Sequence, residues 1–532
     1  MRKQKRVLQL EKSFGQLKKE SFNFSFIKKY FNKKDNSGAL QVLSDRTCSD
    51  LDFEELFMFL DRTTSKVGQQ CLYNQLRVIP SDFNSLKAKE QLICELSENT
   101  PLRVNAQLLL QKLQKEDAYY IRSLFQDKHK EAPKWFFVIR LLSFTSILSL
   151  VLSFITPAML FVFMGTFIVN IGFHYWNKRH LFEYLHSVPE LLKLNGVAQK
   201  LIRIKELNAI NPQVGNSVEI IKKIRNRMSL FRLEANMQNE VEVMFWGILE
   251  LFKIAFLLEP LLLFNVLRRL NTKREAIEEV FHFVGEVDIA ISTASLRSGL
   301  NQFCIPTIHN KEMNAKEVYH PLIVDCITNS IEVTDKSILL TGSNMSGKTS
   351  FIRTIGINVI TGLTLNTCFA QSMKIPHLRV FSAIRISDDL MNDRSYYFQE
   401  VLTIKEMITE SKKDVANLFL LDEIFKGTNT VERIAAGKAV LSALTANKNK
   451  VFVSTHDIEL TDMLADEYDL YHFSEMIKEN NVDFDYKLKE GKLKNRNAIR
   501  ILQINNYPEK LIDEAINISK ELDVAANNKY LN

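Results

Sequence analysis

The sequence predicts a C-terminal domain of the α/β class, preceded by a mainly α-helical region that carries a pair of apolar helices. The α/β domain is indicated by short apolar runs typical of buried strands, the first of which leads through a glycine-rich loop into a helical pattern. The apolar pair is indicated by the stretch from Leu141 to Trp176, which has 36 residues without an Asp, Glu, Lys or Arg. A chain of 532 residues exceeds the size of one growing core, so we expect roughly two to four structural units.

The charge and cysteine content narrow the class of protein only slightly. The net charge of +7 permits contact with nucleic acid or anionic lipid and requires neither. Residues 1–20 hold seven Lys or Arg against two Glu, which indicates a basic arm that is either solvated or faces phosphates or lipid. The six cysteines show no metal-like spacing, so we expect reduced thiols.

The apolar stretch of residues 141–176 is too long for one straight membrane span. A single helix of this length would measure about 54 Å, against a hydrocarbon core of about 30 Å. Pro157 lies near its middle and disfavours helix just before it, which predicts two short helices joined by a tight turn. We therefore expect a transmembrane helical hairpin; the alternative is a buried hairpin in a soluble core.

Basic residues flank the predicted hairpin on both sides. Lys134 and Arg140 precede it, and Lys178 and Arg179 follow it. The positive-inside rule then puts both ends in the cytosol and predicts a multi-pass protein of the inner, cytoplasmic membrane.

A second apolar region runs from Val243 to Arg269. Glu250, Lys253 and Glu259 interrupt it, and each charge would cost about 2.5–3.5 kcal/mol at mid-membrane. Pro260 is expected to break the helix. An interfacial or buried helix pair is therefore the favoured interpretation, and a further span is the alternative.

The glycine-rich loop fits the pattern G-x-x-x-x-G-K-[ST] of a P-loop. Two glycines let backbone N–H groups point at phosphate oxygens, the lysine neutralises the β- and γ-phosphates, and the following hydroxyl is placed for Mg²⁺. The predicted nucleotide-binding residues are Gly342, Ser343, Asn344, Met345, Ser346, Gly347, Lys348, Thr349 and Ser350.

Two later strands deliver further polar groups. Leu418–Leu421 ends in Asp422 and Glu423, and Val451–Ser454 leads to His456. We expect Asp422 to hold Mg²⁺ with Thr349, Glu423 to polarise the attacking water, and His456 to contact the γ-phosphate or position that water. Taken alone, Asp422 and Glu423 could be an acidic pair that caps a helix, and His456 could be a structural histidine. Together with the complete phosphate loop, these residues indicate ATP hydrolysis.

These motifs resemble one family. The segments "TGSNMSGKTS", "SDDLMNDRSYYFQE", "LLDEIFKGTNT" and "STHDIEL" are similar to the C-terminal ATPase domain of the MutS family of DNA mismatch-repair proteins, a branch of the ABC-type ATPases. The similarity runs from about Tyr319 to about Ala515, and "LFMFLDRTTSKVGQQ" and "FVGEVDIAISTASL" resemble the family's helical core and returning lever. The resemblance implies an α/β P-loop (ABC-type) ATPase domain behind an α-helical core and lever region, with ATP and Mg²⁺ as cofactors.

The resemblance also implies a homodimer. Ser395 matches the family's signature serine, which touches the γ-phosphate bound by the opposite subunit, and Glu400 matches a nearby acidic position. The segment Gly427–Thr430 matches a loop that crosses the dimer interface.

The chain departs from the family pattern in several places. The departures are Ser343 for a Pro, the order Lys348-Thr349-Ser350, Asp393 for a Gly, Phe425-Lys426 for Gly-Arg, and Cys326 near the usual adenine-stacking aromatic. They predict altered turnover and weaker adenine selectivity without the loss of a phosphate-binding group.

Combining these observations divides the chain into five parts and leaves two main functions open. The parts are a basic N-terminal arm (1–50), the helical core and lever start (51–130), the hairpin (131–180), a helical region with the returning lever (181–300) and the ATPase domain (301–532). No mismatch-recognition domain is expected before the lever. We expect a membrane-anchored ATPase that couples dimer opening and closing to lever motion and binds DNA through phosphate contacts; the alternative is a membrane-associated mechanical ATPase that acts on a protein or envelope partner without DNA. A third function, a nucleotide-gated scaffold with a degenerate site, is weaker because Lys348, Asp422, Glu423 and His456 are all present.

Overall fold

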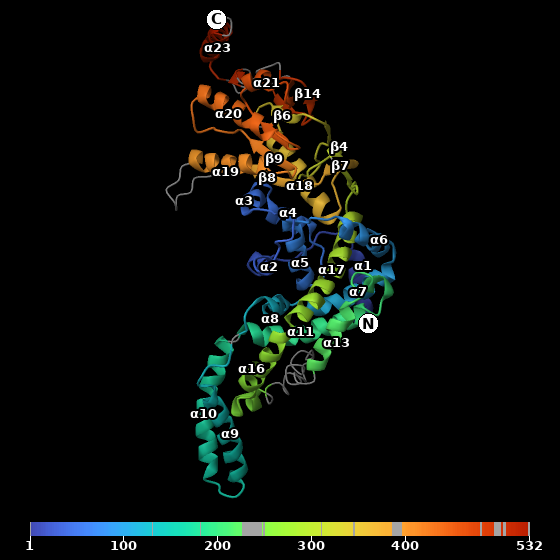
Figure 1. Cartoon of the computed structure of the whole chain (residues 1–532), viewed down its shortest axis with the longest axis vertical. Helices are drawn as coiled ribbons and strands as arrows, with labels where there is room; N and C mark the ends of the chain where they lie inside the picture. Colours follow the sequence, from blue (N-terminus) through green and yellow to red (C-terminus); the bar gives the residue numbers. More distant parts are fainter. Residues whose placement is uncertain are drawn as a thin grey trace. The chain divides into compact units, whose positions relative to one another are not determined.

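The chain forms two compact units, each assembled from segments that are distant in sequence (Figure 1). The computed structural model describes residues 2–129, 131–180, 182–225, 250–309, 311–343, 346–385, 396–478, 481–493 and 507–529, with the single positions 247, 499, 502 and 503. Unit 1 comprises residues 1–37, 60–75 and 84–300, and unit 2 comprises residues 38–59, 76–83 and 301–532. The five-part division of the chain stays a prediction.

Unit 2 is built on a six-stranded sheet in the order β14-β11-β6-β10-β9-β8. The strands are β6 (Ser337–Thr341), β8 (Arg379–Ala383), β9 (Asn417–Asp422), β10 (Lys450–Ser454), β11 (Tyr468–His472) and β14 (Lys489–Glu490). All neighbours are parallel except β14, which pairs antiparallel with β11. The central strands β6 and β10 are buried throughout, as expected of parallel strands covered on both faces.

Helices and smaller sheets complete unit 2. Among the described residues after β6, the helices with defined bounds are α18 (Lys348–Leu365), α19 (Tyr396–Ser411), α20 (Thr430–Leu444), α21 (Glu459–Met463) and α23 (Glu509–Lys529). A second sheet, in the order β3-β7-β4-β5, contains β3 (Thr307–His309), β4 (Met313–Val318), β5 (Asn329–Val333) and β7 (Ser372–Pro376); β12 (Glu475–Lys478) pairs with β13 (Asn481–Phe484). This mixed α/β architecture agrees with the fold class predicted for the C-terminal part.

An N-terminal segment also belongs to unit 2. It contains β1 (Gln41–Val42), which pairs with β2 (Val78–Ile79), and the helices α3 (Asp45–Asp50) and α4 (Phe53–Leu60). The fully buried Asp50 accepts hydrogen bonds from Ser382 Oγ at 2.6 Å and from the backbone N–H of Arg385 at 2.8 Å. These donors hold the end of β8 against Asp50. Separating them would leave a buried carboxylate without hydrogen bonds, which is energetically costly.

Unit 1 is helical in the part of the chain that the structure describes. Its helices are α1 (Arg2–Ser13), α2 (Phe24–Phe31), α5 (Lys66–Arg77), α6 (Asn84–Glu98), α7 (Thr100–Leu110), η1 (Gln111–Leu113), η2 (Glu116–Arg122), α8 (Ser123–Gln126), α9 (Phe136–Ser153), α10 (Met159–His180), α11 (Phe182–Leu201), α12 (Lys205–Asn208), α13 (Val214–Arg225), α16 (Leu258–Leu270), η4 (Asn271–Lys273) and α17 (Arg274–Ser298). The last residues of α5 are grouped with unit 2.

The long helix α17 packs against the start of α5 through a buried carboxylate. Asp288 accepts hydrogen bonds from the N–H groups of Thr64 and Ser65, at 2.8 and 2.7 Å, and from Ser65 Oγ at 2.6 Å. Burial raises the pKa of Asp288 to about 6 in spite of these donors. Gly68 has no room for a side chain, since an added Cβ would lie 2.6 Å from Asp288 Cβ. This contact joins the two segments that resemble the family's helical core and returning lever.

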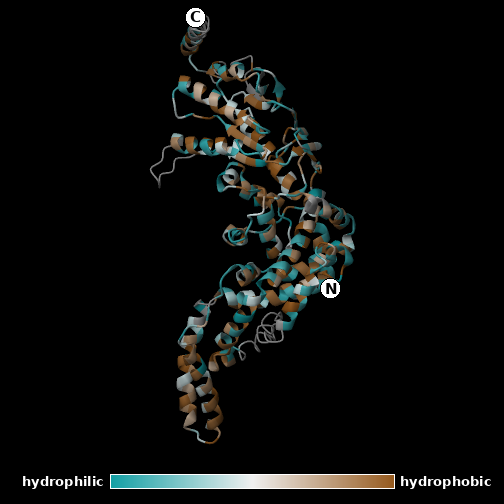
Figure 2. Ribbon diagram, in the orientation of Figure 1, coloured by the Kyte–Doolittle hydropathy of each residue, from teal (hydrophilic) through white to brown (hydrophobic). Residues whose placement is uncertain are grey.

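The helices α9 and α10 form an apolar hairpin. The connecting residues 154–158 contain Pro157, as predicted. The windows Phe136–Ser153 and Met159–Trp176 are long and apolar enough to cross a membrane, with mean hydropathies of 2.0 and 1.4, and only 28% and 11% of their residues are buried. Figure 2 shows the hairpin mostly in the brown of hydrophobic residues. This low burial distinguishes α9 and α10 from the core helices of a soluble protein, which are mostly buried.

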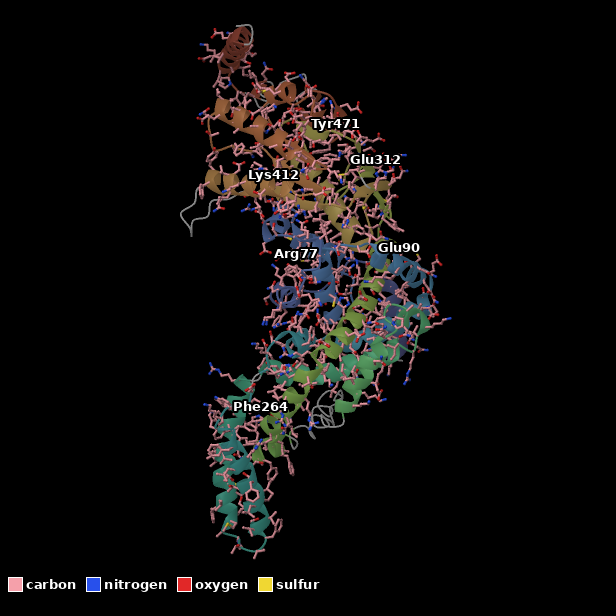
Figure 3. The ribbon with its side chains drawn as sticks, viewed as in Figure 1. Arg77, Glu90, Phe264, Glu312, Lys412 and Tyr471 are labelled. Carbon is pink, nitrogen blue, oxygen red and sulfur yellow. The ribbon has the colours of Figure 1, made fainter. Side chains whose placement is uncertain are left out.

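The described part of the second apolar region packs against this hairpin. Lys253 and Glu259 are buried, and Lys253 Nζ lies 3.3 Å from Glu250 Oε2 and 3.8 Å from Glu259 Oε1. The charged residues that interrupt the region therefore pair with one another. In addition, His174 Nε2 on α10 lies 3.3 Å from Glu250 Oε1. Phe264 on α16, labelled in Figure 3, meets Phe136 of α9 edge to face at 5.0 Å.

The expected helix break at Pro260 is displaced. The break falls at Leu257, whose φ is +47°, and Pro260 lies in the first turn of α16. Proline fits a first helical turn because its missing N–H would have no helical partner there. Most of residues 243–249 lie outside the described part of the chain, so the interfacial or buried helix pair, with a further span as the alternative, stays a prediction.

Candidate nucleotide-binding site

The predicted phosphate loop joins the end of β6 to the start of α18. Gly342 and Gly347 have φ values of +143° and +103°, which residues with side chains rarely adopt. A Cβ on Gly342 would lie 2.6 Å from the carbonyl oxygen of Phe473. Ser346 Oγ donates to the carbonyl of Ser343 at 2.8 Å, and Ser350 is exposed. The predicted residues Asn344 and Met345 lie outside the described residues.

Lys348 lies inside the loop that it follows. Its Nζ donates to the carbonyl oxygens of Gly342 and Ser343 at 2.6 and 2.7 Å, and only 3% of the residue is exposed. Burial lowers the pKa of Lys348 to about 8, and the opposing charges of Glu423 and Asp422 limit the decrease. The loop therefore presents a desolvated cation whose charge an anionic ligand would stabilise.

Thr349, in the first turn of α18, contacts Asp422, the last residue of β9. Thr349 Oγ1 donates to Asp422 Oδ2 at 2.8 Å, and Ser454 Oγ donates to the other carboxylate oxygen. A hydroxyl and a carboxylate in contact are the hard oxygen ligands that Mg²⁺ uses beside phosphate oxygens, so this pair fits a Mg²⁺ ion bound with a nucleotide. Among the described residues, no group of three or more His, Cys, Asp and Glu side chains is placed to hold a metal by itself.

Glu423 and His456 come together as predicted at the same edge of the sheet. His456 Nε2 lies 2.6 Å from Glu423 Oε1, and Lys426 Nζ lies 2.9 Å from Glu423 Oε2. Partial burial would raise the pKa of Glu423, but the hydrogen bonds and charges of His456 and Lys426 outweigh it and lower the pKa to about 2. Glu423 has a φ of +52°, an uncommon conformation for a residue with a side chain.

An ion pair holds the segment that carries His456. Arg433 in the first turns of α20 contacts Asp457 through two hydrogen bonds of 2.9 and 2.6 Å. A bidentate pair of this kind restricts the residues on either side of Asp457. Arg433 and Asp457 could not be recognised from the sequence as supporting residues, because neither their spacing nor their type marks them out. Lys426 stood out only as a departure from the family pattern.

The residues expected at the dimer interface are described only in part. Glu400 is buried, and its Oε1 accepts a hydrogen bond from the N–H of Phe425 at 2.6 Å, while burial raises the pKa of its carboxyl group. Glu400 therefore shapes the turn that precedes Gly427, where an added Cβ would lie 3.0 Å from Tyr397 Cβ. Ser395 lies outside the described residues, and its predicted contact stays a prediction.

An aromatic residue that no sequence motif marks, Tyr486, lies against the phosphate loop. A Cβ on Gly347 would lie 3.2 Å from Tyr486 Cδ1, and 46% of Tyr486 is exposed. The carbonyl oxygen of Tyr486 accepts a hydrogen bond from Asn329 Nδ2 at 3.0 Å, at the start of β5. Cys326 is partly buried, and its Sγ accepts from the N–H of His320 at 3.3 Å. Only the fold reveals Tyr486, because it follows the phosphate loop by more than a hundred residues.

Comparisons with known proteins agree with this geometry. Residues 338–523, which include the site, match the family model described as MutS domain V. Proteins named DNA mismatch repair protein MutS are similar to the chain over longer stretches, of 281 and 324 residues. These findings support a relationship between this chain and the MutS family.

The relatives are distant and longer than the matched region. The chain is 28% identical to the protein from Listeria welshimeri over 281 residues, which cover 50% of this chain and 32% of the relative. The protein from Oceanobacillus iheyensis is 26% identical over 324 residues, or 58% of this chain and 36% of the relative, and that from Aquifex pyrophilus is 29% identical over 253 residues, or 45% and 29%. The matched part of the chain thus spans about a third of the length of these MutS proteins.

Proposed function

We propose that the protein is a MutS-like ATPase anchored in a membrane by the α9–α10 hairpin. The observation that carries the proposal is the meeting of Lys348, the Thr349–Asp422 pair and the Glu423–His456 pair around one phosphate loop. Each of these groups has a defined task in ATP hydrolysis, and the match to MutS domain V supports the same reaction.

The side chains divide the work of hydrolysis among them. Backbone N–H groups of the loop and the N-terminus of α18 bind the phosphates, and the Lys348 ammonium neutralises their charge. Thr349 and Asp422 would hold Mg²⁺, which supplies further neutralisation of phosphate charge when bound. The exposed ring of Tyr486 offers a face on which the nucleotide base stacks, in place of the aromatic residue missing near Cys326.

Glu423 acts on the attacking water. The water oxygen bonds to the γ-phosphorus, the bond from that phosphorus to the bridging oxygen breaks, and ADP leaves with the electron pair. Glu423 orients the water and takes its proton, and His456 holds the carboxylate in place or contacts the γ-phosphate. Ser395 of a second copy would reach the γ-phosphate, so dimerisation would complete the site.

The hairpin would locate the ATPase at a membrane, and the helical unit would convert ATP hydrolysis into motion. Positive charges at both ends of the hairpin favour the ATPase unit in the cytoplasm, and the apolar surface of α9 and α10 supports two crossings of the membrane. Nucleotide-driven opening and closing of the dimer would move the helical lever that contains α17. The names of the MutS relatives favour DNA as the partner, held through its phosphates rather than read at a mismatch.

The test is steady-state ATP hydrolysis by the detergent-solubilised full chain at several salt concentrations, with and without duplex, mismatched and branched DNA. Hydrolysis should require Mg²⁺ and Lys348, and one form of DNA should change it severalfold at near-physiological salt. Hydrolysis that requires Lys348 but ignores every DNA would support the alternative, a mechanical ATPase acting on a protein or envelope partner. Hydrolysis unchanged by Lys348→Ala would refute the ATPase proposal.

A further inference from the structure

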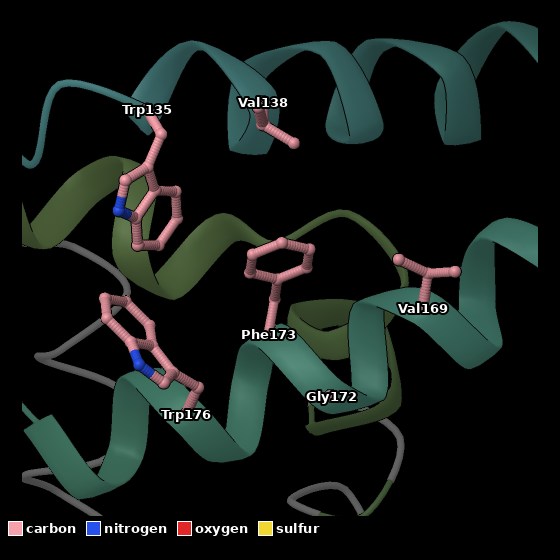
Figure 4. Close-up of a pocket in the computed structure, with 6 residues that line it drawn as sticks. All are labelled: Trp135, Val138, Val169, Gly172, Phe173 and Trp176. Carbon is pink, nitrogen blue, oxygen red and sulfur yellow. The ribbon is translucent and has the colours of Figure 1, made fainter.

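An apolar groove of about 500 Å³ lies between α9 and α10 near the ends of the hairpin that carry the basic residues (Figure 4). Its lining residues are Trp135, Val138, Val169, Gly172, Phe173 and Trp176. The side chains of Trp135 and Val138 face those of Val169, Phe173 and Trp176 across the groove, as Figure 4 shows. The indole rings of Trp135 and Trp176 meet at 4.8 Å and 62° and close one end.

The chemistry of the lining selects a hydrocarbon occupant. The groove is as large as many small-molecule sites, but its walls are aliphatic and aromatic and carry no charged group. A polar ligand would lose its hydrogen bonds to water there without replacement. An alkyl chain would lose none.

The surface beyond the groove is also apolar. Towards the turn of the hairpin, Phe161 is 83% exposed and Ile168 is 67% exposed. A chain lying between α9 and α10 would continue along this surface, in the part of the hairpin proposed to cross the membrane. The indoles lie at the other end, where aromatic side chains are enriched at the boundary between lipid and water.

Positive charge lies next to the indoles. Lys134 directly precedes Trp135, and Arg179 follows Trp176 by three residues, hence on the same face of α10; both side chains are exposed. Glu131 is exposed nearby and offsets part of this charge. The sum favours an anionic group beside the mouth of an alkyl-binding groove, which is the arrangement of groups in a phospholipid.

We propose that the groove between α9 and α10 binds one acyl chain of an anionic phospholipid whose phosphate lies against Lys134 and Arg179. This inference rests on the proposed membrane insertion of the hairpin. It adds a specific lipid site to that proposal, with a defined orientation of the headgroup.

Two glycines of α10 provide a matched pair of variants. A Cβ on Gly172 or on Gly165 would meet no atom within 4 Å, so both positions accept a larger residue. Gly172 lines the groove and Gly165 does not. Gly172→Leu should fill the groove, and Gly165→Leu adds the same side chain to the same helix elsewhere.

The experiment measures quenching of tryptophan fluorescence by brominated lipids. The full chain, with Trp246→Phe so that only Trp135 and Trp176 emit, is reconstituted into phosphatidylcholine vesicles with a minor fraction of phosphatidylglycerol. Bromine is placed on the acyl chains of one lipid or the other at equal content. Brominated phosphatidylglycerol should quench at least about twofold more strongly in the parent protein and in Gly165→Leu. The difference should vanish in Gly172→Leu and in Lys134→Gln/Arg179→Gln.

Each other outcome overturns a defined statement. If the parent protein does not float with the vesicles, membrane insertion fails and the lipid site fails with it. If the parent protein floats but both lipids quench equally, or if Gly172→Leu keeps the preference, only the lipid site fails. If Gly172→Leu keeps the preference and instead reduces cross-linking between copies, the groove receives a second copy of the hairpin.

Discussion

Replacing Lys348 by Met should weaken nucleotide binding without weakening the fold. Only 3% of Lys348 is exposed, and burial lowers the pKa of its ammonium group from 10.5 to about 8. A lysine whose pKa is lower in the folded state than in the unfolded state destabilises the fold while it is charged. That cost is fully present below about pH 8 and disappears as the pH rises towards 10.5.

The magnitude follows from the pKa difference and the two hydrogen bonds of the ammonium group. A decrease from 10.5 to about 8 corresponds to about 3 kcal/mol at 1.36 kcal/mol per pKa unit. Met also lacks the hydrogen bonds to Gly342 and Ser343, which the neutral amine would keep and which stabilise the fold by about 2–3 kcal/mol in total. Lys348→Met should therefore change the free energy of unfolding at pH 7 by only about 1 kcal/mol, in the stabilising direction. Affinity for ATP should fall at least about tenfold, because a charge-assisted contact to phosphate is lost.

Amide hydrogen exchange in peptides covering β6 and α18 would measure the stability, and isothermal calorimetry the affinity. The stability gain of Lys348→Met over the parent protein should shrink when exchange is repeated at about pH 9.5, because the parent lysine is then mostly neutral in the folded state. A variant destabilised by several kcal/mol at pH 7, or a difference independent of pH, would refute the assignment of Lys348 as a desolvated cation. Unchanged ATP affinity would refute its contact with phosphate.

Three further predictions concern the same site. Glu423→Gln should lower kcat at least about 100-fold while ATP still binds. Since the pKa of Glu423 is about 2, protonation of this residue should not reduce the rate of the parent protein above about pH 4. A pH–rate profile of the parent protein, with the variant as baseline, measures both the loss of kcat and its pH dependence. Tyr486→Ala should weaken ATP binding by about 1 kcal/mol or more, whereas Tyr486→Phe should not, because the ring is kept. Equilibrium titrations with a fluorescent ATP analogue measure both affinities. Equal losses in the two variants would show that the hydroxyl, and not the ring, contacts the nucleotide. Gly342→Ala should cost about 1–3 kcal/mol of stability and abolish ATP binding, because its φ of +143° and the Phe473 carbonyl exclude a side chain, whereas Gly491→Ala, also at positive φ but in open space, should leave binding unchanged.

The arrangement of the core of the site could be predicted because parallel strands end at one edge of a sheet. Asp422 and Ser454 are partners in the pairing of β9 with β10, so residues that directly follow these strands must be neighbours. Glu423 and His456 therefore meet although they lie 33 positions apart in the sequence. The position of the phosphate loop could also be predicted, since its glycines occupy backbone conformations that few other residues adopt.

Residues brought in by long-range folding could not be predicted. Tyr486 reaches the phosphate loop because the hairpin of β12 and β13 returns the chain to the main sheet, and no local pattern encodes that return. Asp50 belongs to a segment expected to be part of the N-terminal arm, but it is buried in unit 2 against the end of β8. The break at Leu257 was misplaced because proline is a strong local signal that also fits the first turn of a helix.

The most direct test of the central claim is phosphate release from ATP by the full chain reconstituted in vesicles, compared between the parent protein and Glu423→Gln. The account predicts Mg²⁺-dependent release by protein that floats with the vesicles, and a loss of that release in the variant despite retained ATP binding. Equal release by the two proteins, or activity found only in protein that does not float, would contradict a membrane-anchored MutS-like ATPase.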